Sequence, residues 1–227
     1  EAMRTHIPGT TKIIIAQRIS SVQDADRILV LENGQINGLG THAELLATNA
    51  IYQQFRSWEM CAFPWIGITD IISDDADKGS TPNDALYVLE LDEFTFDANN
   101  AAITGAWTGH YQAIFRANLA IENIPGIAMD TVLRNRLVGE AKVLRAYAYF
   151  RLVQWFGDVP LITRILNADE YYNQERTSKD VVYDFIENDL LTAIEALPEK
   201  SEYPSADLGR VTKGAARGIL AKVDMAR

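Results

Sequence analysis

Apolar residues recur at helical spacing along much of the second part of the chain. Between Asp130 and Phe156 they lie three or four positions apart, which is the spacing expected for the buried face of a long helix. Gly157 and Pro160 follow at the place where such a helix should end. The members of this stripe are Leu133, Leu137, Ala141, Leu144, Ala148, Leu152 and Trp155.

Further stripes predict helices before and after this one. One helix is predicted within residues 107–126, where a Pro-Gly pair stops it. Another starts at a Thr177-x-x-Asp180 capping box and runs to Pro198, and the last begins at about Thr212. Amphipathic helices in consecutive antiparallel pairs predict a mainly α fold with a tetratricopeptide-like helical-repeat scaffold. The pairs lie far apart in the sequence, so the connectors must be long, and long connectors are where binding residues generally lie.

Residues 1–60 show a different pattern. The β-branched run Thr11–Gln17 predicts a short buried strand. Asn33-Gly34 between two apolar runs predicts a hairpin, because both positions of a type I′ turn need a positive φ. Thr41 and Glu44 form a capping box ahead of a short helix. A small α/β piece, made of a strand, a hairpin and a helix, therefore precedes the helical region.

Composition and charge narrow the classes of partner. The chain has 227 residues, is 48% apolar and carries a net charge of −10, so nucleic acid is not an expected partner. Residues 1–60 carry five Lys and Arg against six Asp and Glu, which leaves 16 against 25 for residues 61–227. The acidity therefore belongs to the helical region. The single cysteine, Cys61, allows no internal disulfide and is interpreted as a small core residue.

Acidic residues gather ahead of the first predicted helix, in a segment rich in turn-forming residues. Asp74, Asp75 and Asp77 stand in the stretch SDDADKGSTPND, which predicts an exposed loop. The spacing is compatible with the start of a calcium loop, but the third ligand and the distal glutamate are missing, so a solvated acidic loop is the preferred interpretation and no metal is expected. His110 has no positioned Ser, Cys or second His beside it, so no nucleophilic triad and no enzyme activity are predicted.

The stretch TKIIIAQRISSVQDADRILVLENGQINGLGTHAELL, within residues 1–58, resembles the C-terminal end of the nucleotide-binding domain of an ATP-binding cassette exporter. In that family the strand ends at a switch histidine that contacts the γ-phosphate, and Gln17 stands at the matching position here. The resemblance implies a degenerate half-site. No G-x-x-x-x-G-K-[ST] loop occurs in the sequence, so no nucleotide cofactor is expected.

Three blocks of residues 61–227 resemble the SusD/RagB family of glycan-binding outer-membrane lipoproteins. They are WTGHYQAIFRAN, GEAKVLRAYAYFRLVQWFGDVPLI and GRVTKGAARGILAKV, in the order that the family has them. The resemblance implies a non-catalytic protein that binds an oligosaccharide, works with a TonB-dependent transporter and lies on the outer surface of the outer membrane. Family members are longer and begin with a signal peptide and a lipidated cysteine, neither of which is expected in this sequence.

The resemblance also places the candidate sugar-binding residues. The region that matches the family's glycan site contains Asp74, Asp75, Asp77, Asn99 and Asn100, whose carboxylates and amides suit sugar hydroxyls. The aromatic residues of the matching blocks lie at helical spacing and are interpreted as packing between repeats rather than as sugar platforms. They are Trp107, Tyr111, Tyr147, Phe150 and Trp155.

The two resemblances meet in SWEMCAFPWIGITD, which is too aromatic for a linker. We therefore expect two regions, 1–60 and 61–227, joined between about Phe55 and Ala62 from two truncated coding segments. Two alternatives to the glycan-binding function stay open, namely a fragment of an exporter ATPase domain without a nucleotide site and a chimeric product without function.

Overall fold

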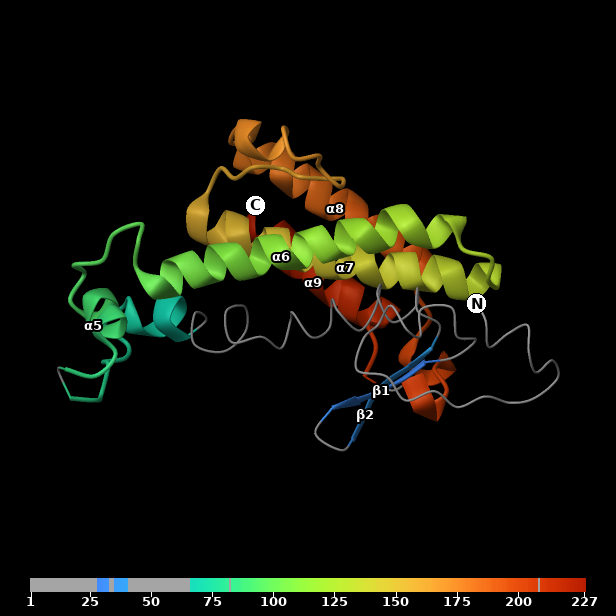
Figure 1. Ribbon diagram of the computed structural model, residues 1–227, viewed down its shortest axis with the longest axis horizontal. Helices are drawn as coiled ribbons and strands as arrows, with labels where there is room; N and C mark the ends of the chain where they lie inside the picture. The colour runs from blue at the N-terminus through green and yellow to red at the C-terminus, as the bar shows by residue number, and fades with distance from the viewer. Residues whose placement is uncertain (1–27, 33–34, 41–65, 82, 208) are drawn as a thin grey trace, which may run out of the picture. The chain divides into compact units, whose positions relative to one another are not determined.

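The computed structural model describes residues 28–32, 35–40, 66–81, 83–207 and 209–227, and the chain divides into two units, Glu1–Leu45 and Leu46–Arg227. In the first unit, β1 (Ile28–Glu32) and β2 (Gln35–Gly40) pair as an antiparallel hairpin (Figure 1). Glu32 lies opposite Gln35, so the predicted hairpin connection at residues 33 and 34 is confirmed. A register shift between Val30 and Leu31 marks a bulge in the ladder.

Several expectations fall outside the described residues. They are the strand Thr11–Gln17, the helix capped by Thr41, the position of Gln17 and the junction between Phe55 and Ala62. The predicted boundary between residues 60 and 61 also lies there and stays a prediction.

The second unit is built from helices, and the predicted mainly α fold is confirmed. Figure 1 shows α6 and α7 running side by side in opposite directions, and α7 also packs against α8, which packs against α9. The elements are η2 (Gly67–Ile71), α5 (Leu86–Asp92), α6 (Ala101–Asn123), η3 (Ile124–Gly126), α7 (Thr131–Phe156), η4 (Tyr171–Asn173), α8 (Lys179–Ala196), η5 (Lys200–Glu202), η6 (Ser205–Asp207) and α9 (Lys213–Ala226).

The ends of α7 and α9 follow from local chemistry. The Asp130 carboxylate accepts a hydrogen bond from the N–H of Leu133 at 2.9 Å and so caps the start of α7. Gly157 ends α7 with a φ of 67°, a conformation that residues with a Cβ rarely adopt. The Thr212 hydroxyl accepts from the N–H of Ala215 at 3.1 Å and caps α9.

The capping box that was predicted at the start of α8 was wrong. The helix begins at Lys179 after Ser178, whose side chain makes no capping bond. The backbone of Thr177 instead exchanges two hydrogen bonds with Val159, and the Asp158 carboxylate accepts from the N–H of Lys179 at 2.8 Å. Pairing across the connector therefore determines where α8 begins, which a local capping signal does not contain.

Helix α6 begins earlier than the stripe from Trp107 predicted, and α5 was not predicted at all. Asn100 is the N-cap of α6, so the helix includes six residues before Trp107. Apart from Ile103, these residues are Ala, Gly or Thr, so they form no stripe of large apolar side chains. The helix ends at Asn123, close to the predicted Pro-Gly stop, and continues into η3.

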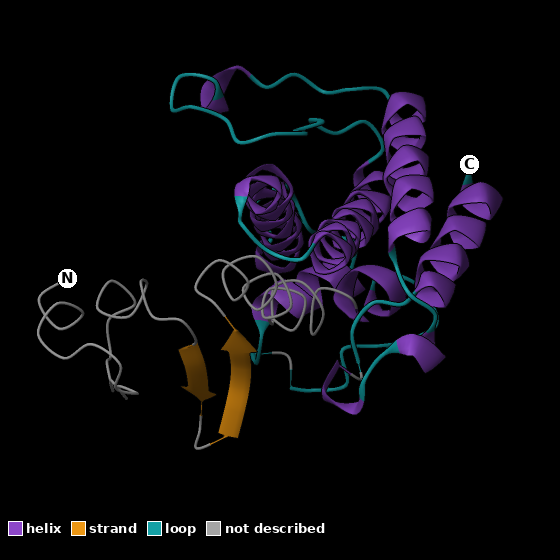
Figure 2. Ribbon diagram, turned by 90° about the vertical axis from the view of Figure 1, so that its right-hand side faces the viewer, coloured by secondary structure: helices purple, strands orange, loops and turns teal. Residues whose placement is uncertain are grey.

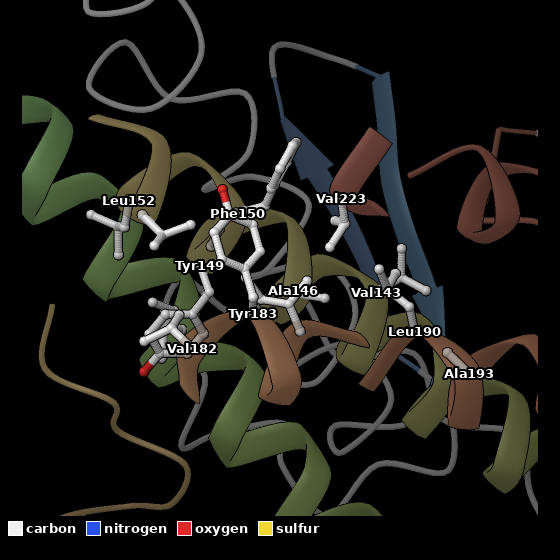
Figure 3. Close-up of a cluster of buried hydrophobic side chains, with 14 of the residues drawn as sticks. Val143, Ala146, Tyr149, Phe150, Leu152, Val182, Tyr183, Leu190, Ala193 and Val223 are labelled. Carbon is white, nitrogen blue, oxygen red and sulfur yellow. The ribbon is translucent and has the colours of Figure 1, made fainter. Parts of the chain in front are cut away.

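The core lies between the long helices. Figure 3 shows side chains of α7, α8 and α9 converging in one cluster, in which Tyr149, Leu152, Val182 and Leu190 are fully buried. Of the predicted apolar stripe of α7, Ala148 and Leu152 belong to this cluster, whereas Leu137, Ala141 and Leu144 pack in a second cluster with residues of α6. Close helix contact is possible at Gly139, because a Cβ at this position would lie 3.3 Å from the Cβ of Ala196 on α8.

A long connector, residues 157–178, joins α7 to α8. Figure 2 shows it as a long loop without regular structure apart from the short η4 along it. The prediction of a long connector between the two helix pairs is therefore confirmed. Within the described residues, no helix combines the length and the apolar character needed to cross a bilayer.

Candidate functional site

The acidic loop predicted from the sequence is an exposed turn ahead of α5. Asp74, Asp75 and Asp77 are exposed to solvent. The Ser73 hydroxyl holds the start of this turn, because it donates to the carbonyl of Asp70 at 2.7 Å and accepts the N–H of Asp75 at 3.2 Å. The three carboxylates therefore face solvent on a locally fixed turn.

Asn99 and Asn100 have different surroundings. Asn99 is exposed, whereas Asn100 is only 3% exposed. The Asn100 amide oxygen accepts the N–H of Ala102, and its NH₂ group donates to the carbonyl of Tyr87 at 2.8 Å and to Glu90 Oε2 at 2.7 Å. Because these bonds use both donors and the acceptor, the side chain of Asn100 ties α5 to the start of α6.

The structure brings these two loops to the same end of the helical unit. Both lie beside α5, where α6 begins (Figure 1). A small core of Ile71, Val88, Leu91 and Ala102 supports this end. In the ranges that the structure describes, no group of three His, Cys, Asp or Glu side chains is placed to hold a metal ion.

His110 is a buried part of the helix packing. It is 1% exposed, its Nδ1–H donates to the carbonyl of Ala106 at 2.7 Å, and its ring stands edge-to-face to Trp155. Burial lowers the pKa of His110 to about 4, and the nearby Arg151 charge acts in the same direction. The imidazole is therefore neutral near pH 7.

A buried polar cluster lies where α6, α7 and α8 meet the connector. Arg145 donates to both carboxylate oxygens of Asp189, at 2.8 and 2.9 Å. The remaining guanidinium nitrogen of Arg145, Nη1, donates to Asn118 Oδ1 at 2.6 Å and to the carbonyl of Thr163 at 3.0 Å. The charge is thus paired and hydrogen-bonded, which is the condition under which a buried guanidinium is tolerated.

The same cluster holds the connector against the helices without a sheet. The Tyr149 hydroxyl donates to the carbonyl of Ile162 at 2.9 Å and accepts its N–H at 2.7 Å. The Asn118 amide donates to the carbonyls of Ile162 and Arg164. The Tyr111 hydroxyl donates to the carbonyl of Pro160 at 2.8 Å. Side chains of α6 and α7 therefore satisfy the backbone of an extended segment that would otherwise need a neighbouring strand.

A cavity of about 540 Å³, here called the α6 groove, lies between α6 and this part of the connector. Trp107, Tyr111 and Phe115 line it from α6, and Arg164 and Tyr171 line it from the connector. The aromatic residues of α6 are four positions apart, so they stand on one face of the helix. Trp107 and Tyr111 were interpreted as packing residues, and they do pack against the core, but each also lines the groove.

The groove was missed in the sequence because half of it comes from an irregular connector. The signal that was available is the four-residue spacing of aromatic residues on α6 together with the Tyr171-Tyr172 pair in the connector. Neither feature shows by itself that the two segments lie together.

The similarity of the helical unit to known proteins covers most of the chain. A family model described as starch-binding and associating with the outer membrane, SusD-like, matches residues 68–225. A SusD-like protein of Bacteroides ovatus is 34% identical over 137 residues, which is 59% of this chain and 24% of that protein.

Solved structures show the same likeness. A laminarin-binding SusD-like protein superposes with a TM-score of 0.72 at 30% identity, over 81% of this chain and 39% of that one. A structure described as containing a xylogluco-oligosaccharide superposes with a TM-score of 0.62 at 29% identity, over 82% of this chain and 34% of that one.

A second similarity is short. A multidrug resistance transporter of Lactococcus lactis, described as an ATP-binding and permease protein of the ATP-binding cassette type, is 40% identical over 60 residues, which is 26% of this chain and 10% of that protein. This short likeness is to the same class of transporter that residues 1–58 resemble.

The match of the family model shows to which family the helical unit belongs. The curated SusD-like relatives are much longer, since the matched parts span about a quarter to a third of their length. With the model matched from residue 68 to residue 225 and the helices superposed on SusD-like structures, the chain belongs to the SusD-like family of starch-binding, outer-membrane-associated proteins.

Proposed function

We propose that this chain binds an oligosaccharide without chemically changing it, and that it does so at the outer surface of the outer membrane for uptake by a TonB-dependent transporter. The observation that carries the proposal is the SusD-like match over residues 68–225. It is supported by the fold that the chain shares with a laminarin-binding protein.

The proposed contact surface is the pair of loops beside α5. Asp74, Asp75, Asp77 and Asn99 are exposed there, and carboxylates and amides offer acceptors and paired donors to sugar hydroxyls. Asn100 serves this surface indirectly, because its amide is used in fixing α5 to α6.

Calorimetric titration of the 227-residue chain with laminarin-derived and xyloglucan-derived oligosaccharides tests this proposal. We expect binding by the wild-type chain and a loss of affinity of at least about tenfold in the variant Asp74→Ala/Asp75→Ala, because a hydrogen bond to a charged group contributes about 1.5–3 kcal/mol and a loss of about 1.4 kcal/mol is tenfold. Chromatography of the sugar after incubation should return it unchanged.

A charge-matched variant controls for long-range electrostatics. Glu195→Ala/Asp224→Ala removes two exposed acids from α8 and α9 and should leave the affinity unchanged. Equal losses in the two variants would show that the loops make no specific contact.

The transporter partnership is tested separately. The tagged chain, expressed in its source cells and purified from solubilised outer membranes, should bring a TonB-dependent transporter with it, identified by mass spectrometry. Recovery of the chain alone under conditions that preserve other membrane complexes would count against the partnership.

We also infer that the exporter-like and SusD-like regions come from two coding segments joined between about Phe55 and Ala62. The inference is supported by a likeness to a cassette exporter over 60 residues and by a SusD-like family match that starts only at residue 68. Amplifying genomic DNA across these codons tests it. A product of the expected length from native DNA would place the join within the gene itself, whereas failure to amplify these codons as one piece would show that the two segments are not adjacent in the genome.

A further inference from the structure

The α6 groove combines exposed aromatic surface with a polar rim. Phe115 is 41% exposed on α6, and Tyr171 is 49% exposed on the facing connector. Thr108 and Gln112, which also line the groove, are exposed and supply a hydroxyl and an amide. The cavity of about 540 Å³ falls within the range of about 300–1,000 Å³ that is usual for small-molecule sites.

The groove offers no unpaired charge from its lining. Its charged member is Arg164, whose guanidinium donates to both carboxylate oxygens of Glu170, at 2.9 and 2.5 Å. Glu170 is held in turn, because its carboxylate accepts the N–H of Asn167 at 2.9 Å. Since the positive charge is matched within the connector, a neutral ligand suits the groove better than an anion.

The connector wall of the groove is fixed before any ligand arrives. Ile162, which lines the groove, has both its backbone N–H and its carbonyl bonded to the Tyr149 hydroxyl. The N–H of Ile165 donates to Glu122 Oε1 at 2.6 Å, which adds an anchor on α6. A wall held in this way lowers the cost of ordering on binding, which is the benefit of preorganisation.

From these features we propose that the α6 groove is a second saccharide-binding site, in which the apolar face of a neutral hexose unit stacks on Tyr171 and Phe115 while its hydroxyls meet the rim. Aromatic faces suit the C–H face of a sugar ring, and uncharged amide and hydroxyl groups suit its hydroxyls. The site lies on α6 and the connector 157–178, whereas the loops proposed above lie beside α5. This inference rests on the proposed function, because both sites bind an oligosaccharide, but it adds a second binding position in the fold.

Adjacent tyrosines provide a matched test in the 227-residue chain. Tyr171 lines the groove, whereas Tyr172 is 93% exposed and does not. We expect Tyr171→Ala to weaken binding of laminarin-derived or xyloglucan-derived oligosaccharides about three- to tenfold, which corresponds to the loss of one aromatic stacking contact. Phe115→Ala should act in the same direction, and Tyr172→Ala should titrate like the wild type. Both tyrosines are exposed, so circular dichroism should show the three variants folded.

Repeating the titrations in the Asp74→Ala/Asp75→Ala background separates this inference from the proposed function. Binding that persists in that background and is weakened a further three- to tenfold by Tyr171→Ala supports the groove. If Tyr171→Ala and Phe115→Ala bind like the wild type while the loop variant loses its binding, the groove inference is overturned and the loop site stands. If the wild-type chain binds neither sugar, both are overturned.

Discussion

Arg145 of α7 and Asp189 of α8 form a two-point ion pair inside the helix packing. Nε lies 2.8 Å from Oδ2 and Nη2 lies 2.9 Å from Oδ1, and the side chains are 5% and 2% exposed. The pair joins the two helices, and Arg145 also holds the carbonyl of Thr163. It therefore links the helical scaffold to the connector that forms one wall of the α6 groove.

Breaking this pair on one side should be strongly destabilising. We expect Asp189→Leu to lower the free energy of unfolding by about 3–5 kcal/mol, because it leaves the Arg145 charge buried without a counterion. Urea unfolding followed by circular dichroism measures the loss. The double variant Arg145→Met/Asp189→Leu should recover part of it, since no unpaired charge remains, but not all of it, because Asn118 Oδ1 and the Thr163 carbonyl lose Arg145 as their donor.

An exposed pair supplies the control. Arg217 and Glu199 are 3.1 Å apart, but their side chains are 59% and 45% exposed. Arg217→Ala should cost no more than about 1 kcal/mol, because solvent screens such pairs. Similar losses for Asp189→Leu and Arg217→Ala would contradict the role of burial.

The Tyr149 hydroxyl should contribute measurably to the stability of the fold, although it is a single atom with its hydrogen. Tyr149→Phe removes the partner of the Ile162 N–H and one of the partners of its carbonyl, so we expect a loss of about 1–3 kcal/mol in the free energy of unfolding. Hydrogen exchange should show reduced protection at the Ile162 amide. Tyr172→Phe, at a position that is 93% exposed, should change neither quantity.

Two helical glycines should respond in opposite directions to a larger side chain. Gly105 has open space where a Cβ would lie, so Gly105→Ala should stabilise the chain by about 0.5–1 kcal/mol through helix propensity. At Gly139 a Cβ would lie 3.3 Å from Ala196 Cβ and 3.4 Å from Leu197 Cγ. Gly139→Val should therefore destabilise it by about 1–3 kcal/mol. Thermal unfolding that ranks the variants in the reverse order would contradict the close approach of α7 and α8.

The sequence was sufficient where a signal was local and strong. The stripe from Leu133 to Trp155, with Asp130 ahead of it and Gly157 after it, determined α7 to the residue, since both caps act within a few positions of the helix ends. It was insufficient where the partner is distant in the chain. The start of α8 depends on the pairing of Thr177 with Val159 across the connector.

The candidate site was likewise predictable from the sequence only where the signal is local. Turn chemistry correctly predicted an exposed acidic loop, but it could not distinguish Asn99 from Asn100, because the burial of Asn100 depends on α5. The α6 groove required a connector whose extended path is set by Tyr149, Asn118 and Arg145, all of which lie outside it in sequence. Side chain to backbone bonds of this kind have no periodic signature.

Buried His110 should make stability depend on pH in a defined window. Its pKa is about 4 in the folded chain and about 6.5 when exposed, so the unfolded chain binds the proton more readily between these values. The contribution of neutral His110 is therefore fully present above about pH 6.5 and is lost as the pH falls toward 4, by up to about 3 kcal/mol. Urea unfolding at pH 7, 5.5 and 4 should show this loss in the wild-type chain. His110→Gln should have a shallower pH dependence, whatever its stability at pH 7, because the two proteins differ in no other ionisable group. Parallel curves for the two proteins would show that His110 is protonated as easily in the folded chain as in the unfolded one.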